Sequence, residues 1–312
     1  MNTMKAVQLH AYGPTDNLRY EDVQRPTPSP GEVLVRVHAA SVNPIDGAIR
    51  AGYMAQHLPL TFPWIPGRDF SGVVEATGEG VTTLQAGDEV FGLTALPGNG
   101  SYAEYVAVPA TNVVPKPRTF DYDPAAALPL AALTAWQGLF GGGLDLQPGQ
   151  TVLILGAAGG VGHLAVQLAK WKGARVIGAG RATHEADIRQ AGADVFVDTA
   201  NGLDAAGPVD AVLALIGGDV AQQAWAQLKH GDAYASTLGA PSADEATAKS
   251  ARTTAVFTQA NAAHLTAIAA IADQGALLPH VAQTLPLAHA AQAQELLASP
   301  AGPTGKLVLV VR

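Results

Sequence analysis

The sequence predicts an α/β protein in which a doubly wound parallel sheet is joined to a second domain rich in short β-strands. Over Val152–Gly162, an apolar strand breaks at a glycine turn that leads directly into a helix. From residue 150 to residue 278, apolar strands alternate with helical patterns, which is typical of a parallel sheet. Residues 5–117 instead carry short alternating strands punctuated by glycine and proline, which is typical of a compact β domain.

Composition limits the classes of function. The chain has 312 residues, of which 48% are hydrophobic, enough for two domains with sizeable cores. Only 14% are charged, the net charge is −8, and no basic cluster stands out, which argues against a nucleic-acid partner. Cysteine is absent, which excludes disulfides and thiolate metal sites and fits a cytoplasmic protein. No segment has the pattern of a signal peptide or a membrane span, so we expect no membrane partner.

Short strands are expected along the first third of the chain, where apolar and polar residues alternate. These strands are Lys5–Leu9, Leu18–Val23, Glu32–Ala40, part of Ile65–Gly78, Glu89–Leu93 and Gly100–Val108. Three prolines, Pro26, Pro28 and Pro30, favour an extended connector before the third strand. Ser41–Asp46 is interpreted as a polar turn in which Pro44 holds Asn43 extended.

A helix is expected next, beginning at Asp123 or Pro124, continuing through Phe140 and ending at Gly141–Gly143. Strand, turn and helix then meet at Ala157-x-Gly159-x-x-Gly162, where a bare backbone lets a diphosphate approach the helix N-terminus. We expect dinucleotide contacts from Ala157, Ala158, Gly159, Gly160, Val161 and Gly162. The alternative is an ordinary tight turn between a strand and a helix.

Further strands are expected in the remainder of this region, over residues 174–181, 193–198, 208–215, 232–239 and 253–257. Helices are expected over 184–191, 220–228 and 262–274, and Ala240–Lys249 is interpreted as a loop. Near the C-terminus we expect a helix at Leu287–Leu297 and a last strand at Lys306–Val311.

The strand expected over residues 174–181 indicates which cofactor is bound. An NAD-binding chain usually has an acidic residue at the strand's end, whereas this chain has Gly180 and Arg181. Glycine leaves room for a 2′-phosphate and arginine can pair with it, so we expect NADPH rather than NADH. Candidate cofactor contacts at the ends of later strands are Ile216, Leu238 and Phe257.

The order of these segments resembles the medium-chain dehydrogenase/reductase superfamily, and within it the zinc-free NADPH:quinone oxidoreductase (zeta-crystallin-like) branch. The matching segments are Ser41–Asp46, Gly67–Gly72, Ala86–Gly92, Gly100–Val106, Leu128–Trp136, Gly156–Gly162 and Gly305–Leu309. The resemblance implies a Rossmann domain over residues 122–278 and a GroES-like substrate domain formed by 1–121 and 279–312. It also implies a homodimer formed through the Rossmann domain, with the 253–257 strand at its edge.

The resemblance predicts that no metal is bound. Alcohol-oxidising members hold a catalytic zinc through cysteine and histidine ligands, and those positions are occupied here by Asn43, Arg68 and Leu130. Where a structural-zinc lobe belongs, only the short loop Leu93–Asn99 is present. The positions of Asp46 and Arg68 suggest instead a carboxylate–guanidinium pair across the former metal site.

Reduction of an electron-poor acceptor needs hydrogen-bond donors where negative charge develops on an oxygen. The candidates are the Asn43 amide and the Tyr53 and Thr134 hydroxyls, and the resemblance also places Thr134 near the nicotinamide. Each has another interpretation: Asn43 as a turn cap, Tyr53 as a surface aromatic, and Thr134 as a helix residue bonded to its own backbone.

These observations together predict an NADPH-dependent reductase of quinones or α,β-unsaturated carbonyls that needs no zinc. Transfer as hydride or as single electrons remains open. The alternatives are an enoyl-thioester reductase, for which no basic patch is evident, and a protein that holds NADPH as a sensor or structural component without turnover.

Overall fold

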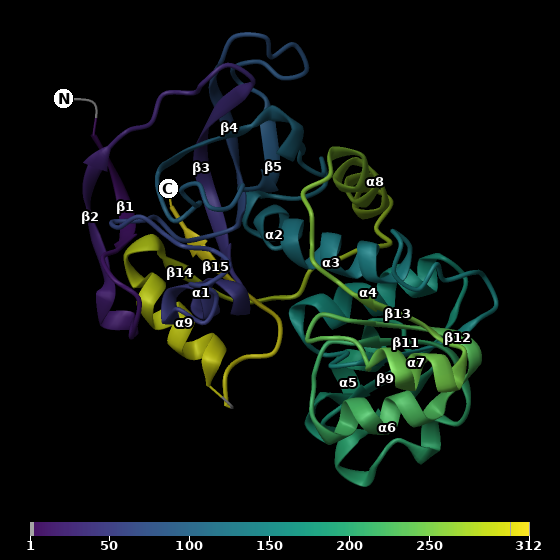
Figure 1. The fold of residues 1–312 in the computed structure, drawn as a ribbon. Helices are drawn as coiled ribbons and strands as arrows, with labels where there is room; N and C mark the ends of the chain where they lie inside the picture. The colour runs from purple at the N-terminus through teal and green to yellow at the C-terminus, as the bar shows by residue number, and fades with distance from the viewer. Residues whose placement is uncertain (1–2, 300, 312) are drawn as a thin grey trace. The chain divides into compact units, whose positions relative to one another are not determined.

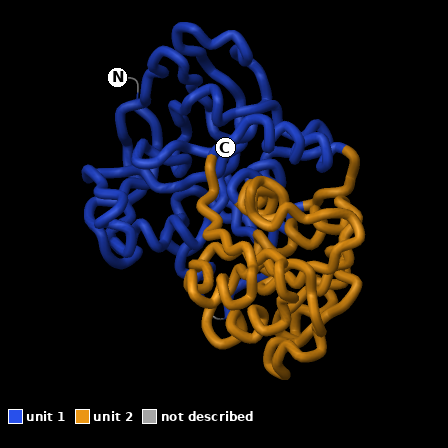
Figure 2. Tube along the Cα trace, turned by 45° about the vertical axis from the view of Figure 1, so that its right-hand side comes forward, with its two compact units in different colours: residues 1–130, 260–273, 279–312 blue, residues 131–259, 274–278 orange. Residues whose placement is uncertain are grey.

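The computed structural model describes residues 3–299 and 301–311. Its internal contacts divide the chain into two units (Figure 2). The first comprises residues 1–130, 260–273 and 279–312, and the second 131–259 and 274–278. The sequence-based division differs, because it changes domain at 121/122 and assigns 260–273 to the Rossmann domain. Each unit has a hydrophobic core of its own.

The second unit contains a six-stranded sheet in which every neighbouring pair of strands is parallel. Its spatial order is β10-β9-β8-β11-β12-β13, the order of a doubly wound dinucleotide-binding sheet. The fold class expected from the sequence is therefore confirmed. The strands are β8 (Thr151–Leu155), β9 (Arg175–Gly180), β10 (Val195–Asp198), β11 (Val209–Ala214), β12 (Leu228–Ser236) and β13 (Arg252–Ala255).

Four of the five connections between successive strands contain an α-helix, as is usual for parallel pairing. These helices are α4 (Gly160–Trp171), α5 (Glu185–Gln190), α6 (Asp219–Gln227) and α7 (Ala243–Lys249). Helix α3 (Pro129–Leu139), which begins in the first unit, precedes β8. Short 3₁₀ turns are η3 (Ala182–His184), η4 (Thr199–Asn201) and η5 (Asp204–Ala206). Alternate strand residues such as Leu153 and Leu155 share a buried cluster with Ala224 of α6, while Val152 and Ile154 are buried outside that cluster. Burial on both faces explains why the central strands β8 and β11 are almost continuously apolar.

The first unit is built on a mixed seven-stranded sheet. Six strands follow the order β14-β15-β3-β4-β5-β7, and β6 also pairs with β3. Their bounds are β3 (Glu32–Val42), β4 (Asp69–Thr77), β5 (Glu89–Leu93), β6 (Tyr105–Pro109), β7 (Val113–Pro115), β14 (Val281–Pro286) and β15 (Lys306–Val310). A separate antiparallel pair is formed by β1 (Thr3–Leu9) and β2 (Leu18–Gln24). The C-terminal β15 pairs antiparallel with the end of β3, so residues far apart in the sequence meet in the middle of this sheet.

Four helices accompany the first unit: α1 (Pro44–Ala51), α2 (Tyr122–Ala126), α8 (Ala262–Asp273) and α9 (Ala290–Ala298). Its 3₁₀ turns are η1 (Thr15–Asn17), η2 (Ala110–Asn112) and η6 (Leu287–His289). Helices α1 and α9 contact one another and are drawn side by side in Figure 1.

Five elements differ from the expectations. The supposed turn at Ser41–Asp46 contains the end of β3 and opens α1, because Asn43 and Pro44 suit the start of a helix. The single helix expected from Asp123 is two helices, since Pro129 begins a new one. The expected loop Ala240–Lys249 contains α7, which a Ser242–Glu245 capping box initiates. Strands β7 and β14 were not expected.

Candidate functional site

The glycine turn after β8 has the geometry of a diphosphate cradle. Gly156 takes a φ of 73°, which reverses the chain at the end of the strand. A Cβ atom on Gly162 would lie 2.1 Å from the Gly156 carbonyl oxygen, so only glycine lets α4 start this close to the turn. A Cβ on Gly159, the N-cap of α4, would approach nothing closer than 3.4 Å. The unpaired N–H groups of the first turn of α4 therefore open onto an uncrowded backbone.

The neighbouring strand β9 places Gly180 and Arg181 beside this turn, since β8 and β9 are adjacent and parallel. The Arg181 side chain is exposed, and its carbonyl caps the short turn η3. A Cβ on Gly180 would lie 2.8 Å from the terminal methyl of Ile188, a contact that a small movement of this side chain would relieve. An arginine at this edge of the sheet is placed to meet an anionic group.

Large apolar side chains follow the ends of the other three strands of this half. Ile216, Leu238 and Phe257 come after β11, β12 and β13 and are 37%, 65% and 77% exposed. Thr134 of α3 is buried, and its hydroxyl lies 2.6 Å from the hydroxyl of Thr258, directly after Phe257. The carboxyl edge of the sheet thus carries all the cofactor-contact residues expected from the sequence except Thr134, which a hydrogen bond joins to it.

The first unit contains a buried cluster of charged and polar side chains. Asp69 is fully buried and accepts at both oxygens: Oδ1 from the Leu130 N–H at 2.6 Å, and Oδ2 from Ser41 Oγ at 2.5 Å and Asn43 Nδ2 at 2.8 Å. Lys306 Nζ donates to Asn43 Oδ1 at 2.5 Å and lies 3.5 Å from Asp69 Oδ2. Asp69 and Lys306 were not among the site residues expected from the sequence. The signal for each was a charged residue at the start of an otherwise apolar strand, at Asp69-Phe70 and at Lys306-Leu307.

Asp46, in the first turn of α1, belongs to the same cluster. Its Oδ2 accepts from the Asn43 N–H at 2.8 Å, half of a capping box, and from the Tyr102 hydroxyl at 2.9 Å. Its Oδ1 is buried without a hydrogen-bond partner. Burial raises the pKa of Asp46 to about 6, although the two hydrogen bonds oppose the change. Burial also raises the pKa of Tyr102 well above its ordinary value.

The expected ion pair between Asp46 and Arg68 is not formed, so that prediction was wrong. The Asp46 carboxylate is turned toward its own helix N-terminus and Tyr102, where it has two donors. Arg68 is buried, and its Nε has no hydrogen-bond partner. Burial lowers the pKa of the Arg68 guanidinium, while the charges of Asp46 and Asp69 act to raise it. The two groups therefore interact through their charges without direct contact.

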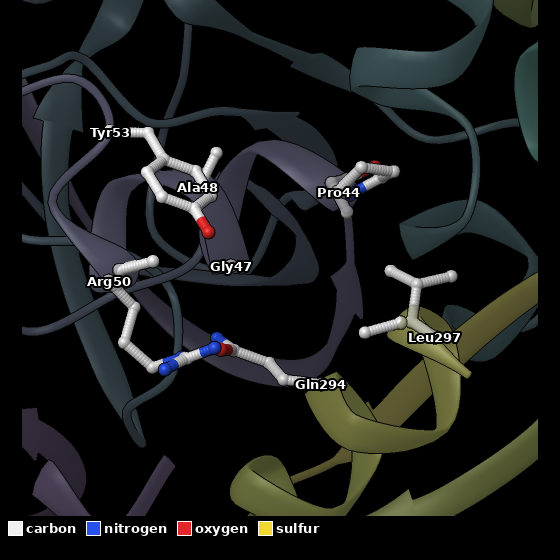
Figure 3. A pocket seen from close by; sticks show the side chains of 10 residues that line it. Pro44, Gly47, Ala48, Arg50, Tyr53, Gln294 and Leu297 are labelled. Atoms are coloured by element: carbon white, nitrogen blue, oxygen red, sulfur yellow. The ribbon is translucent and has the colours of Figure 1, made fainter. Parts of the chain in front are cut away.

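A pocket of about 310 Å³ opens between α1 and α9 (Figure 3). Asn43 is among the lining residues. Pro44 and Tyr53 line one side, and Tyr53, although 84% exposed, points its hydroxyl into the hollow. Gln294 and Leu297 of α9 line the other side, and Arg50 Nε donates to Gln294 Oε1 at 2.8 Å. The wall is mainly apolar with a few convergent polar groups, as in sites for small molecules.

The residues at the positions assigned to zinc ligands do not fit a metal ion. The Asn43 oxygen, the one atom there able to act as a ligand, already accepts a hydrogen bond from the Lys306 ammonium. Arg68 brings a second cationic group, and Leu130 has no donor atom. Within residues 3–299 and 301–311, no three histidine, aspartate or glutamate side chains are grouped as a metal site. Over the same residues, no helix has the length and apolar character needed to cross a membrane.

Comparisons with known proteins agree with this architecture. Residues 29–118 match the alcohol dehydrogenase GroES-like domain, and residues 188–309 match the zinc-binding dehydrogenase model. The solved quinone oxidoreductase from Coxiella burnetii is 34% identical, with a TM-score of 0.90, over 99% of this chain and 100% of that one.

Curated relatives match over a shorter region. A chloroplast envelope quinone oxidoreductase homolog from Arabidopsis thaliana is 38% identical over 62% of this chain and 61% of its own length. A 2-methylene-furan-3-one reductase from Solanum lycopersicum is 41% identical over 62% of this chain and 52% of its own length. The chain thus spans about three fifths of the length of the first of these and about half of the second. By fold, sequence and full-length structural similarity, the chain belongs to the medium-chain dehydrogenase/reductase superfamily.

Proposed function

We propose that this protein is an NADPH-dependent oxidoreductase that reduces quinones or α,β-unsaturated carbonyl compounds without a metal ion. The observation that carries the proposal is the open glycine cradle at Gly156–Gly162 with Arg181 at the end of the adjacent strand. A relative named as a quinone oxidoreductase and another named as a furanone reductase support the acceptor class. A cytoplasmic location and a homodimer joined through the second unit remain part of the proposal.

The residues of the second unit would hold the cofactor. The first-turn N–H groups of α4 bind the diphosphate, and Arg181 pairs with the 2′-phosphate. Ile216, Leu238 and Phe257 offer apolar surface for the remainder of the molecule. When bound, the cofactor supplies a hydride or electron equivalents from its nicotinamide.

The residues of the first unit would handle the acceptor. The pocket between α1 and α9 has the size of a small ring compound, and its apolar wall excludes water from part of the acceptor's surface. As the acceptor is reduced, negative charge grows on its oxygen, and the Asn43 amide and the Tyr53 hydroxyl are the donors that stabilise it. Thr134 of the second unit, whose hydroxyl is hydrogen-bonded to that of Thr258, is the third candidate donor.

Steady-state kinetics with both cofactors test the proposal. Arg181→Ala removes the cation expected to meet the 2′-phosphate, so the KM for NADPH rises about tenfold while the KM for NADH changes by less than about twofold. Arg189→Ala is the matched control, because Arg189 pairs with Glu185 on the surface of α5 in the same unit. Equal effects of Arg181→Ala on both cofactors would remove the argument for NADPH.

A panel of acceptors separates the proposal from its rivals. Oxidation of NADPH with a small quinone or enone, followed by its absorbance, supports a reductase. Turnover confined to enoyl thioesters assigns the chain to thioester reduction instead. Tight NADPH binding without turnover on any acceptor identifies a sensor or structural role.

A further inference from the structure

The buried Lys306 ammonium lies among three acceptors around Asn43. It donates a short hydrogen bond to Asn43 Oδ1 at 2.5 Å, while the Val42 carbonyl at 3.3 Å and Asp69 Oδ2 at 3.5 Å are longer, weaker contacts. Lys306 is the first residue of β15, and Asn43 directly follows β3, so the pairing of these two strands brings them together. No other cation is in hydrogen-bonding contact with Asn43 among the described residues.

This arrangement allows the Asn43 amide only one orientation. The ammonium can only donate, and an ionised carboxylate can only accept. Oδ1 must therefore face Lys306, and Nδ2 must face Asp69, as observed. Turning the amide over would set a donor against the ammonium and an oxygen against the carboxylate, and both contacts would be repulsive inside a low-dielectric interior.

The same orientation leaves one amide hydrogen weakly held. Asn43 Nδ2 has two hydrogens: the first makes a good bond to Asp69 at 2.8 Å, and the second faces the Ser41 carbonyl at 3.4 Å, beyond the usual range. Asn43 also lines the pocket between α1 and α9. The weakly held hydrogen is thus the one that an acceptor oxygen could take at small cost.

We propose that Lys306 is a positioning residue for reduction: it fixes the orientation of the Asn43 amide, which keeps the weakly held N–H available to the acceptor oxygen, and strengthens that donor by polarising the amide. The inference rests on the function proposed above. Hydrogen bonds in series polarise one another, so an ammonium on the amide oxygen makes the amide N–H a stronger donor. For stability alone, an apolar side chain of similar size in place of a buried ion pair is often neutral or favourable, so orientation is what the lysine adds.

Turnover by four proteins tests the role: wild type, Asn43→Ala, Lys306→Met and the double variant, with a small quinone or enone at saturating NADPH. Loss of one donor to a developing oxyanion lowers kcat by about a hundredfold, the loss expected for Asn43→Ala. Lys306→Met is expected to lower kcat at least about tenfold and leave the KM for NADPH unchanged. The double variant should be no worse than Asn43→Ala alone, because both act through one group.

Lys5→Met is the matched control, because it removes a lysine–aspartate pair, Lys5–Asp22, from the surface of the same unit. Its kcat should equal that of the wild type. Lys306→Met leaves the Asp69 charge buried without its cation, so a companion variant, Lys306→Met with Asp69→Asn, removes both charges and protects the fold.

The pH profile supplies a readout that a purely structural role would not move. Burial lowers the pKa of Lys306, against the charges of Asp69 and Asp46, which act to raise it; Arg68 and Tyr102 are the other ionisable groups of this cluster. The wild-type kcat should therefore fall at alkaline pH below the ordinary lysine range, and this alkaline limb should be absent from the Lys306→Met variants.

Each result decides between the two proposals. An active wild type whose Lys306→Met variant keeps kcat within about twofold, while Asn43→Ala loses it, overturns the role of Lys306 and leaves the reductase standing. A wild type that binds NADPH and turns over no acceptor overturns the reductase and this inference with it. If neither Lys306 variant folds, a wild-type kcat that stays level to pH 10.5 overturns the inference, and an alkaline limb supports it.

Discussion

At the scale of single residues, substitutions of two glycines in one turn are expected to have different effects, one on stability and the other on NADPH binding. Gly162→Ala sets a Cβ 2.1 Å from the Gly156 carbonyl oxygen, so the turn or α4 must move and stability falls by about 1–3 kcal/mol. Gly159→Ala meets nothing closer than 3.4 Å at an ordinary φ, so its fold should survive while its NADPH affinity drops. Thermal unfolding and NADPH titration of both variants measure the contrast, and equal losses of stability would contradict it.

Asp46 gives a pH-dependent contribution to stability whose sign follows from its pKa. Burial raises that pKa from 3.8 to about 6, so the folded state binds the proton more tightly than the unfolded state. The contribution is fully present below pH 3.8 and is lost as pH rises through about 6, a change of about 3 kcal/mol.

Asp46→Asn should abolish this change. The difference in free energy of unfolding between wild type and variant should therefore shift by that amount between pH 3.5 and pH 7.5, favouring the wild type at acid pH. Chemical denaturation at several pH values provides the measurement. A difference independent of pH would show that the carboxyl titrates normally.

The sequence predicted the glycine turn, which follows from backbone rules. It did not predict the partners of buried side chains, because several donors compete for one carboxylate. The glycine turn depends on strand, turn and helix in succession, and the sequence states all three. The expected Asp46–Arg68 ion pair required the Asp46 carboxylate to face Arg68. The carboxylate instead accepts hydrogen bonds from the Asn43 N–H and the Tyr102 hydroxyl. The partner of Asp69 lies 237 positions away at Lys306, a separation that local patterns do not record.

At the scale of secondary-structure elements, the sequence pattern located all six strands of the parallel sheet. The signal was strongest at the central strands β8 and β11, where burial on both faces leaves an apolar run. The two helices that were not expected are short, and each begins at a recognisable cap. Helix α1 opens with Asn43 and Pro44, and α7 with Ser242 and Glu245, both recognisable start signals. Strand β14 is mostly exposed, so it lacks the apolar pattern of its neighbours.

Strand β13 is the edge of the six-stranded sheet and is the surface expected to join two copies of the chain. Light scattering should then give a mass of about twice 31.9 kDa. Ala255→Lys places a charge at an exposed position of that edge strand and should yield monomers, because a lysine on an edge strand opposes its pairing with a second chain. A monomeric wild type, or a variant that stays dimeric, would move the interface elsewhere.

At the scale of the whole molecule, cofactor binding should be visible as stability. A ligand that binds only the folded state at a hundred times its Kd adds about 2.7 kcal/mol to the free energy of unfolding. At equal concentrations NADPH should raise the melting temperature more than NADH, and Arg181→Ala should remove the difference. Equal shifts by both cofactors in the wild type would show that the 2′-phosphate is not recognised.

The pairing of β15 with β3 also sets an order of events during synthesis. Asp69 and the middle of its sheet emerge from the ribosome long before Lys306, and the whole second unit is made in between. The second unit can therefore fold first. The first unit cannot complete its sheet, and the Asp69 carboxylate lacks its cation, until β15 with Lys306 has been synthesised. A nascent chain lacking only β15 should accordingly carry one folded half and one half that is still accessible to proteases.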